Sequence, residues 1–330
     1  MVYQPEHHYL WDFWVAPRRS PDDPYHLFHL QAPRTIASPH DRHWVATVGH
    51  AVSRDLVAWE PRPTALGPGA PGAWDDMAIW TGCVVDHGGV YYLFYTGIST
   101  RERGRVQRIG VATSTDLETW ERHPANPVLT ADPRHYATLG PPPWDWEACR
   151  DPWVVADPDG DGFLLYHTAN AAGLDHERAG VVGAARSADL VAWEPLPPVT
   201  ELGAHGMLEV PQLVRTAGRW HLLYCTFRHT PAHLARAGSP GAWFGTHYLT
   251  GPGPRGPFRA IADDLLAADA AGTYYAGRVV EDGPDGATVF LAFRQWDPAG
   301  GFVGALSDPS PLIVRPDGSL SVDRARLWPG

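Results

Sequence analysis

A motif that recurs three times constrains the fold of this chain more than any other feature. The pattern S-x-D-L-x-x-W-E occupies residues 53–60, 114–121 and 187–194. A small-residue strand precedes each copy, so that Ser and Asp can cap a turn while Leu and Trp return to an apolar layer. The repetition indicates an architecture of equivalent units, and we interpret the motif as part of the scaffold.

A second series supplies five such units. Aromatic-rich segments typical of strands begin at five positions, namely Tyr25, Tyr91, Phe163, Trp220 and Val289. Another segment lies just before each one, and its apolar second half is typical of a buried central strand. Where the S-x-D-L motif is also present, the unit contains four strands, which is the composition of one propeller blade. We therefore predict an all-β chain that folds as a five-bladed β-propeller.

The composition favours the same fold. The chain holds 34 Gly, 33 Pro and 15 Trp, which is typical of many short strands joined by turns. A parallel α/β fold would need amphipathic helices of about ten or more residues between the strands, and the sequence contains almost none. We expect residues 1–330 to form a single closed domain.

Charge and residue usage exclude several classes of chemistry. A formal net charge of −11 argues against a nucleic-acid binder, which needs a basic stripe for the phosphates. The sequence contains no lysine, so neither a Schiff base on the chain nor a Walker-type phosphate loop is available. No H-E-x-x-H or comparable ligand spacing occurs, and we expect no catalytic metal and no cofactor.

The cysteines and the N-terminal sequence indicate the cellular compartment in which the protein folds. Cys83, Cys149 and Cys225 are odd in number and form no C-x-x-C pair, so we predict neither a disulfide framework nor a zinc site. No signal-peptide pattern and no bilayer-length apolar run is present, from which we expect a cytoplasmic location and no membrane partner. The sequence does not predict an oligomeric state.

Three carboxylates occupy similar places in the inner segments. Asp12, Asp151 and Glu209 begin the inner segments of the first, third and fourth units, where the second and fifth units have Trp80 and Tyr275. Innermost strands of a propeller run side by side around the axis, so we expect these residues to converge on one funnel. A lone acid at a strand end is often a turn cap, but three at matching positions favour a functional site.

Clustered carboxylates in an apolar funnel suit glycoside hydrolysis. Each raises the proton affinity of its neighbours, so that one ionised and one protonated acid can act on the same sugar. Tryptophans offer flat surfaces on which sugar rings pack. The candidates for such surfaces are Trp11, Trp14, Trp80, Trp144 and Trp146.

The motifs around these residues resemble glycoside hydrolase families 32 and 68, which act on fructans and sucrose and share a five-bladed propeller. The segment "RDPWVV" is similar to the R-D-P motif of these families, "LEVPQL" to E-C-P-D-L, and "GHAVSRDLVAWE" to G-H-A-x-S-x-D-L-x-x-W. The first segment, "LWDFWVAP", resembles family 68 more than family 32. The chain ends too early for the β-sandwich that usually follows the propeller in family 32, and we expect none.

The resemblance implies roles for individual residues. Asp12 would be the nucleophile, Asp151 the stabiliser of the transition state and Glu209 the general acid/base. Arg150 and Trp80 would help to bind a furanosyl ring. With Trp11, Trp14 and Tyr275, these two residues complete our candidate substrate contacts.

The expected function is that of a retaining hydrolase or transglycosylase acting on a small or oligomeric β-fructofuranoside. One alternative is an inverting arabinofuranosidase or xylosidase similar to family 43, which uses the same fold and three acids. A further alternative is a propeller that binds a sugar without cleaving it.

Overall fold

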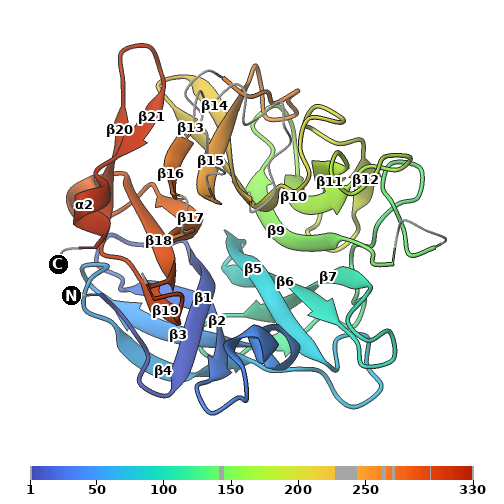
Figure 1. Cartoon of the computed structure of the whole chain (residues 1–330), viewed down its shortest axis with the longest axis horizontal. Helices are drawn as coiled ribbons and strands as arrows, with labels where there is room; N and C mark the ends of the chain where they lie inside the picture. The colour runs from blue at the N-terminus through green and yellow to red at the C-terminus, as the bar shows by residue number, and fades with distance from the viewer. Residues whose placement is uncertain are drawn as a thin grey trace.

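The five-bladed β-propeller is confirmed by a computed structural model that describes residues 2–140, 145–226, 244–261, 265–269, 272–297 and 299–328. The described residues form five antiparallel sheets around a central axis (Figure 1). The first strand of each blade contacts the first strand of the next, and the fifth contacts the first, which closes the ring. These inner strands are β1 (His8–Val15), β5 (Ala78–His87), β9 (Cys149–Ala156), β13 (Glu209–Thr216) and β17 (Tyr274–Val280).

Each blade continues outward by antiparallel pairing. The second strands are the five aromatic-rich segments, β2 (Tyr25–Pro33), β6 (Val90–Ile98), β10 (Phe163–Asn170), β14 (Arg219–Thr226) and β18 (Val289–Trp296). In blades 1 to 4 the third strands are β3 (Thr47–Ser53), β7 (Gln107–Ser114), β11 (Gly180–Ser187) and β15 (Phe244–Gly251). The outer strands are β4 (Glu60–Leu66), β8 (Glu121–Arg122), β12 (Glu194–Leu196) and β16 (Leu265–Asp269).

Blade 5 departs from this pattern, because β18 pairs with both β19 (Phe302–Leu306) and β20 (Ser310–Val314), and β21 (Leu320–Val322) forms its edge. Within the described parts of the chain the helical elements are short, namely the 3₁₀ helices η1 (Pro39–Val45) and η2 (Pro284–Gly286) and the helix α2 (Arg324–Leu327). Among the described residues, no helix has the length and apolar character needed to span a membrane.

The S-x-D-L motif forms a turn at the end of the third strand. In the first copy, Asp55 Oδ1 accepts hydrogen bonds from the backbone N–H groups of Val57 and Ala58, at 2.9 and 2.8 Å. Leu56 takes a positive φ of 61° and is fully buried. Asp116 and Asp189 make the same bonds in the other two copies. The interpretation of the motif as scaffold is therefore confirmed.

The register of the inner strands predicts a large effect at one glycine. A Cβ at Gly82 would lie 2.2 Å from the carbonyl oxygen of Phe94 and 3.3 Å from Trp14 Cζ2. Because the nearest atom belongs to the backbone, we expect Gly82→Ala to destabilise the protein by about 1–3 kcal/mol. A lower urea midpoint at an unchanged m-value would show this. Gly67→Ala is the matched control, since a Cβ at Gly67 meets nothing within 4 Å; equal midpoints for the two variants would contradict the register.

Candidate active site

All five inner strands carry a β-bulge at the same level. The register shifts lie at Trp11/Phe13, Trp80/Gly82, Tyr166/Thr168 (opposite β9), Glu209/Gln212 and Tyr275/Arg278. A bulge bends its strand and redirects the side chains beside it. The last paired residues before the bulges are Trp11, Trp80, Arg150, Glu209 and Tyr275, and the residues that follow them are Asp12, Thr81, Asp151, Val210 and Ala276.

All of these residues except Ala276 line one cavity of about 740 Å³. It brings together all three predicted carboxylates, Asp12, Asp151 and Glu209. The predicted contact residues that line it are Trp11, Trp80, Arg150 and Tyr275. Residues far apart in the sequence therefore meet at the axis because each blade presents its bulge there.

The structure corrects the alignment of the acids by one residue. The sequence pattern places Glu209 in register with Asp12 and Asp151, whereas the pairing places it in register with Arg150, the residue before Asp151. Thr81 occupies the position of the two aspartates in blade 2. The sequence pattern aligns the segments by residue type, whereas the bulges lie at one level in all five strands and place Glu209 just before the bulge and the two aspartates just after its start.

The predicted aromatic surfaces do not all lie at the cavity. Trp14 is fully buried, stacks on Phe28 at 6.4 Å between ring centroids, and does not line the cavity. The expectation that Trp14 contacts substrate is therefore wrong, since it lies two residues beyond the bulge on the core side. Trp146 does line the cavity, and the Arg150 guanidinium lies 5.5 Å from its ring centre. Trp144 lies outside the described residues.

Asp12 is held in a setting that favours its protonated form. Burial raises the pKa of Asp12 from 3.8 to about 7, and the nearby carboxylates of Asp151 and Glu209 add to the shift. Two groups act in the opposite direction, namely the Thr81 hydroxyl, which donates a hydrogen bond to Asp12 Oδ2, and the cation of Arg278. Asp12 is therefore a carboxylate whose charge depends on its neighbours.

Asp151 is fixed more rigidly than Asp12. Its Oδ2 accepts hydrogen bonds from Thr168 Oγ1 at 2.7 Å and from the Val210 N–H at 3.2 Å, and its own N–H donates to Thr96 Oγ1 at 2.9 Å. The backbone of Asp151 has a φ of 57°, and that of Val210 has a φ of 53°. Such values are costly for residues other than glycine and often occur at functional sites. The side chain therefore has one defined direction at the floor of the cavity.

Glu209 has a cation and a hydroxyl as partners. Arg150 Nη2 donates to Glu209 Oε1 at 2.6 Å, and the Tyr275 hydroxyl donates to Oε2. Burial alone would lower the pKa of Arg150, but Glu209 and Asp151 outweigh it and hold that pKa above its ordinary value. Arg150 Nη1 also donates to Gln107 Oε1 at 3.0 Å. Glu209 and Asp12 therefore differ in partners, which is a requirement for two acids with different tasks.

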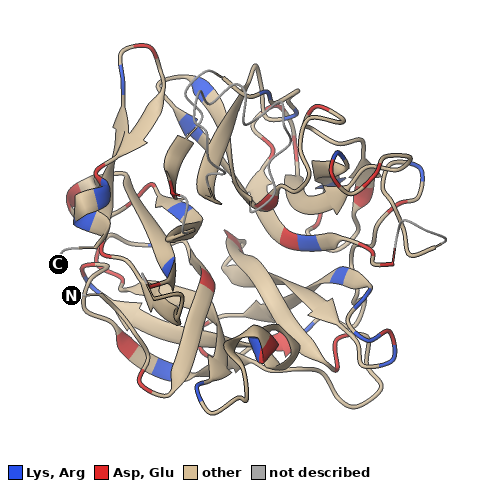
Figure 2. Ribbon diagram, in the orientation of Figure 1, with Lys and Arg blue, Asp and Glu red and all other residues tan. Residues whose placement is uncertain are grey.

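A second buried cation, Arg278, lies deeper along the axis. It is 1% exposed and donates to the carbonyl oxygens of Pro211 at 2.7 Å and Phe13 at 3.4 Å, so it joins strands of three blades. Burial lowers the pKa of Arg278, while Asp12 and Asp151 act to raise it. Figure 2 shows acidic and basic residues on the inner strands around the axis as well as on the outer loops. Arg278 thus balances part of the negative charge of the site.

Sequence reasoning missed the wall of the cavity that η1 forms. Arg42, His43 and Trp44 of η1 line the cavity, and the Trp80 indole donates to the His43 carbonyl oxygen at 2.7 Å. Burial lowers the pKa of Arg42 to about 10, against the opposite effect of Asp12. These residues follow the second strand of blade 1 and belong to no repeat. The "DRHW" run between two strands was the available signal.

The high pKa of Asp12 has a consequence for stability. Between about pH 4 and pH 7 the folded chain holds a proton on Asp12 that the unfolded chain has lost, so this residue reduces stability as the pH rises through that window. We expect Asp12→Asn, which keeps an acceptor for Thr81, to raise the Tm by at least about 2 °C at pH 8. The gain should vanish near pH 4. Calorimetry of both proteins at the two pH values measures it, and a lower Tm for the variant at pH 8 would contradict the assigned shift.

The arrangement defines a class by its fold, that of five-bladed propellers with carboxylates at the axis. The β-fructofuranosidase of family 32 from Bombyx mori has the same fold, with a TM-score of 0.69 and 21% identity over 97% of this chain and 65% of that chain.

The family follows from the sequence. A model described as the N-terminal domain of glycosyl hydrolases family 32 matches residues 20–301, and the chain belongs to this family. A levanase from Bacillus sp. strain L7 is 28% identical over 341 residues, which cover 95% of this chain and 33% of that protein. Beta-fructofuranosidase 1 from Zea mays is 29% identical over 255 residues, 76% of this chain and 34% of that protein. The chain thus spans about a third of the length of these curated relatives.

Proposed function

We propose that the chain hydrolyses β-fructofuranosides with retention of configuration, or transfers the fructosyl group to a sugar hydroxyl. The observation that carries this proposal is the cavity in which Asp12 and Glu209 lie near each other with different partners, Thr81 for the first and Arg150 with Tyr275 for the second. Membership of family 32 supports it, as do the names of the relatives, a levanase and a β-fructofuranosidase.

In the proposed first step, an Asp12 carboxylate oxygen attacks the anomeric carbon. The bond from that carbon to the leaving oxygen breaks, and protonated Glu209 gives its proton to this oxygen. The product is a fructosyl ester on Asp12 and a free alcohol. In the second step Glu209 takes a proton from water, the resulting hydroxide equivalent attacks the anomeric carbon, and Asp12 leaves as a carboxylate.

The residues around the two acids support these steps. Asp151 accepts hydrogen bonds at Oδ2 from two protein groups, which fixes its carboxylate to hold sugar hydroxyls and to face positive charge at the anomeric carbon. Burial and the neighbouring acids raise the pKa of Asp12, and Arg278 and Thr81 oppose that shift and so support the carboxylate that attacks. Trp80 and Trp146 provide apolar walls for the rings.

The test is an activity screen with sucrose, levan, inulin and aryl arabinofuranosides, read by product stereochemistry in NMR. The proposal predicts release of fructose in the β-configuration from at least one fructofuranoside before mutarotation. Inverted product from an arabinofuranoside would instead identify the family 43-type reaction. Sugar binding in calorimetry without turnover of any of these substrates would identify a binding protein.

A further inference from the structure

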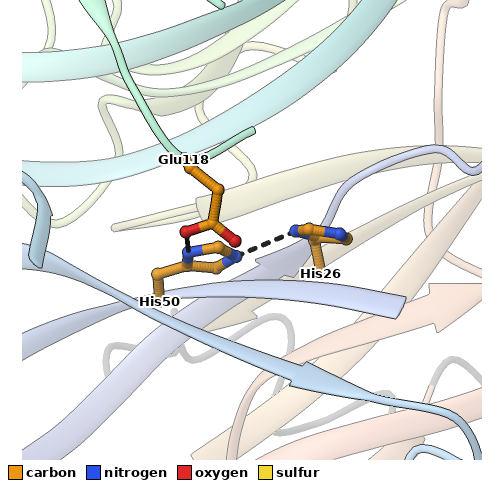
Figure 3. A group of neighbouring side chains, drawn as sticks. All are labelled: His26, His50 and Glu118. Carbon is orange, nitrogen blue, oxygen red and sulfur yellow. Dashed lines mark hydrogen bonds and ion pairs between the residues drawn. The ribbon is translucent and has the colours of Figure 1, made fainter. Parts of the chain in front are cut away.

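A cluster of two histidines and a glutamate lies at the seam between blades 1 and 2. His26 belongs to β2, His50 to β3, and Glu118 to the turn between β7 and β8 (Figure 3). His26 Nδ1 lies 2.9 Å from His50 Nε2, and His50 Nδ1 lies 3.4 Å from Glu118 Oε2. One ligand atom from each residue lies within 4.8 Å of the other two. None of the three lines the carboxylate cavity.

The seam between blades 2 and 3 is an internal control, because it is packed in the same way. In the first seam, Phe28 meets Trp120 edge to face at 5.6 Å and 83°. In the second, Phe94 meets Trp193 at 5.6 Å and 84°. The two seams can therefore be compared position by position.

The second seam has neither histidine nor a carboxylate at the positions equivalent to His26, His50 and Glu118. Phe28 pairs with His50 in blade 1, and Phe94 pairs with Val111 in blade 2. Counting back along β2 and β6 by the same registers, His26 corresponds to Tyr92. Within the S-x-D-L motif, Glu118 corresponds to Val191. These three positions of the second seam show that the fold accepts tyrosine and valine where the first seam has histidine and glutamate.

Both imidazoles of the cluster are shielded from solvent, and this burial bears on their protonation. Burial lowers the pKa of His50 to about 3, and burial also lowers the pKa of His26, with the cation of Arg62 contributing to both. Arg62 is itself paired with Glu60 at 3.4 Å. A neutral imidazole offers a lone pair to a metal without first losing a proton, and burial acts in that direction at both rings.

Glu118 sets the direction of that lone pair. An Nδ1–H of His50 directed at Glu118 leaves His50 Nε2 as the acceptor that faces His26 Nδ1. A carboxylate on the second nitrogen of a metal-bound histidine is a common arrangement in metal sites. The hydrogen bond between the two rings would give way to the ion, with the His26 proton on Nε2 and both facing nitrogens free to bind. Nitrogens bound to tetrahedral zinc are about 3.3 Å apart, so the two nitrogens need to separate by about 0.4 Å and the rings to turn until both lone pairs meet at the ion.

We propose that His26 and His50, supported by Glu118, bind a divalent transition-metal ion of the zinc class at the seam between blades 1 and 2. Imidazole nitrogen suits zinc, copper and nickel better than calcium or magnesium, which prefer oxygen ligands. Water completes the coordination on the exposed side, where the Glu118 side chain is 41% exposed. The ion joins two strands of blade 1, and Glu118 links the site to a turn of blade 2 through His50.

The test is Zn²⁺ binding to EDTA-treated full-length protein, followed by titration calorimetry and by thermal unfolding. We expect one equivalent to bind to the wild type and to raise its Tm. The double variant His50→Val/Glu118→Val, which carries the residues of the control seam, should fold and lose the calorimetric site. His7→Asn/His8→Asn is the matched control for imidazole removal and should leave the site intact, since both residues lie near the chain start, outside the cluster.

A variant at the partly exposed residue keeps the test decisive if the double variant does not fold. Glu118→Gln retains size and polarity, and we expect it to weaken Zn²⁺ binding by about 10- to 100-fold, as for other carboxylates that orient a ligating histidine. Absence of a stoichiometric site in the wild type, or unchanged affinity in Glu118→Gln, would overturn the proposal. The cluster would then be a chain of hydrogen bonds alone.

Discussion

Asp12→Ala is expected to lower kcat/KM on a cleaved fructofuranoside by about 10⁴-fold or more, because the nucleophile of the first step is removed and no neighbouring group can replace it. Arg150 and Tyr275 engage Glu209, and Asp151 accepts two hydrogen bonds at Oδ2. Steady-state kinetics with the substrate found in the screen measure the loss.

The matched control for this variant is Asp22→Ala, which removes an exposed carboxylate that does not line the cavity. It should keep wild-type kinetics. Circular dichroism and Tm establish that Asp12→Ala is folded, and the raised pKa of Asp12 predicts that it is at least as stable as the wild type at pH 8. A folded Asp12→Ala protein with more than a few per cent of wild-type activity would exclude Asp12 as the nucleophile.

Glu209→Gln is expected to give the second largest effect, with a dependence on the leaving group that identifies the role. For sucrose, whose leaving group needs a proton, we expect kcat/KM to fall by about 10²- to 10⁴-fold. For an aryl fructofuranoside with an acidic phenol, the first step should stay fast and the second should limit turnover. A burst of phenol followed by a slow steady state measures this, and stopped-flow absorbance resolves the two phases.

Tyr275→Phe provides the comparison for Glu209→Gln, because it removes only the hydroxyl that donates to Glu209 Oε2. It should change the pH profile of turnover more than the leaving-group dependence. An equal loss of kcat/KM for sucrose and for the aryl substrate in Glu209→Gln would contradict the assignment of Glu209 as acid/base.

The fold was predictable because its information is repeated along the chain. The S-x-D-L motif fixes a turn through Asp55, Asp116 and Asp189, and each aromatic-rich segment forms the second strand of a blade. A single motif would indicate only a turn. Five ordered units leave few architectures other than a closed ring, and residues at equivalent places in the ring must then meet at the axis.

The details of the site were less predictable, and the bulges are the main reason. A bulge adds one residue to a strand without a distinctive composition, so the register of Glu209 against Asp151 could not be fixed from the pattern. The same effect misplaced Trp14, which the alternation of side chains puts in the core rather than in the cavity.

Residues that act through long-range packing gave almost no signal. Arg278 occupies an apolar inner strand, and only the closed ring shows that it contacts the carbonyl oxygens of Phe13 and Pro211 and lies near two aspartates. Arg42 and His43 come from a connection between strands, whose path follows from tertiary contacts rather than from local preference. In both cases the position of a side chain at the cavity depends on tertiary contacts that no local sequence pattern encodes.

The measurement that tests the central claim most directly is mass spectrometry of the Glu209→Gln protein, quenched during turnover of an aryl fructofuranoside and digested with pepsin. The account predicts that one peptide gains the mass of one fructosyl group and that fragmentation places it on Asp12. A fructosyl group on any other residue, or complete turnover of the substrate to inverted product with no adduct at any time point, would contradict it.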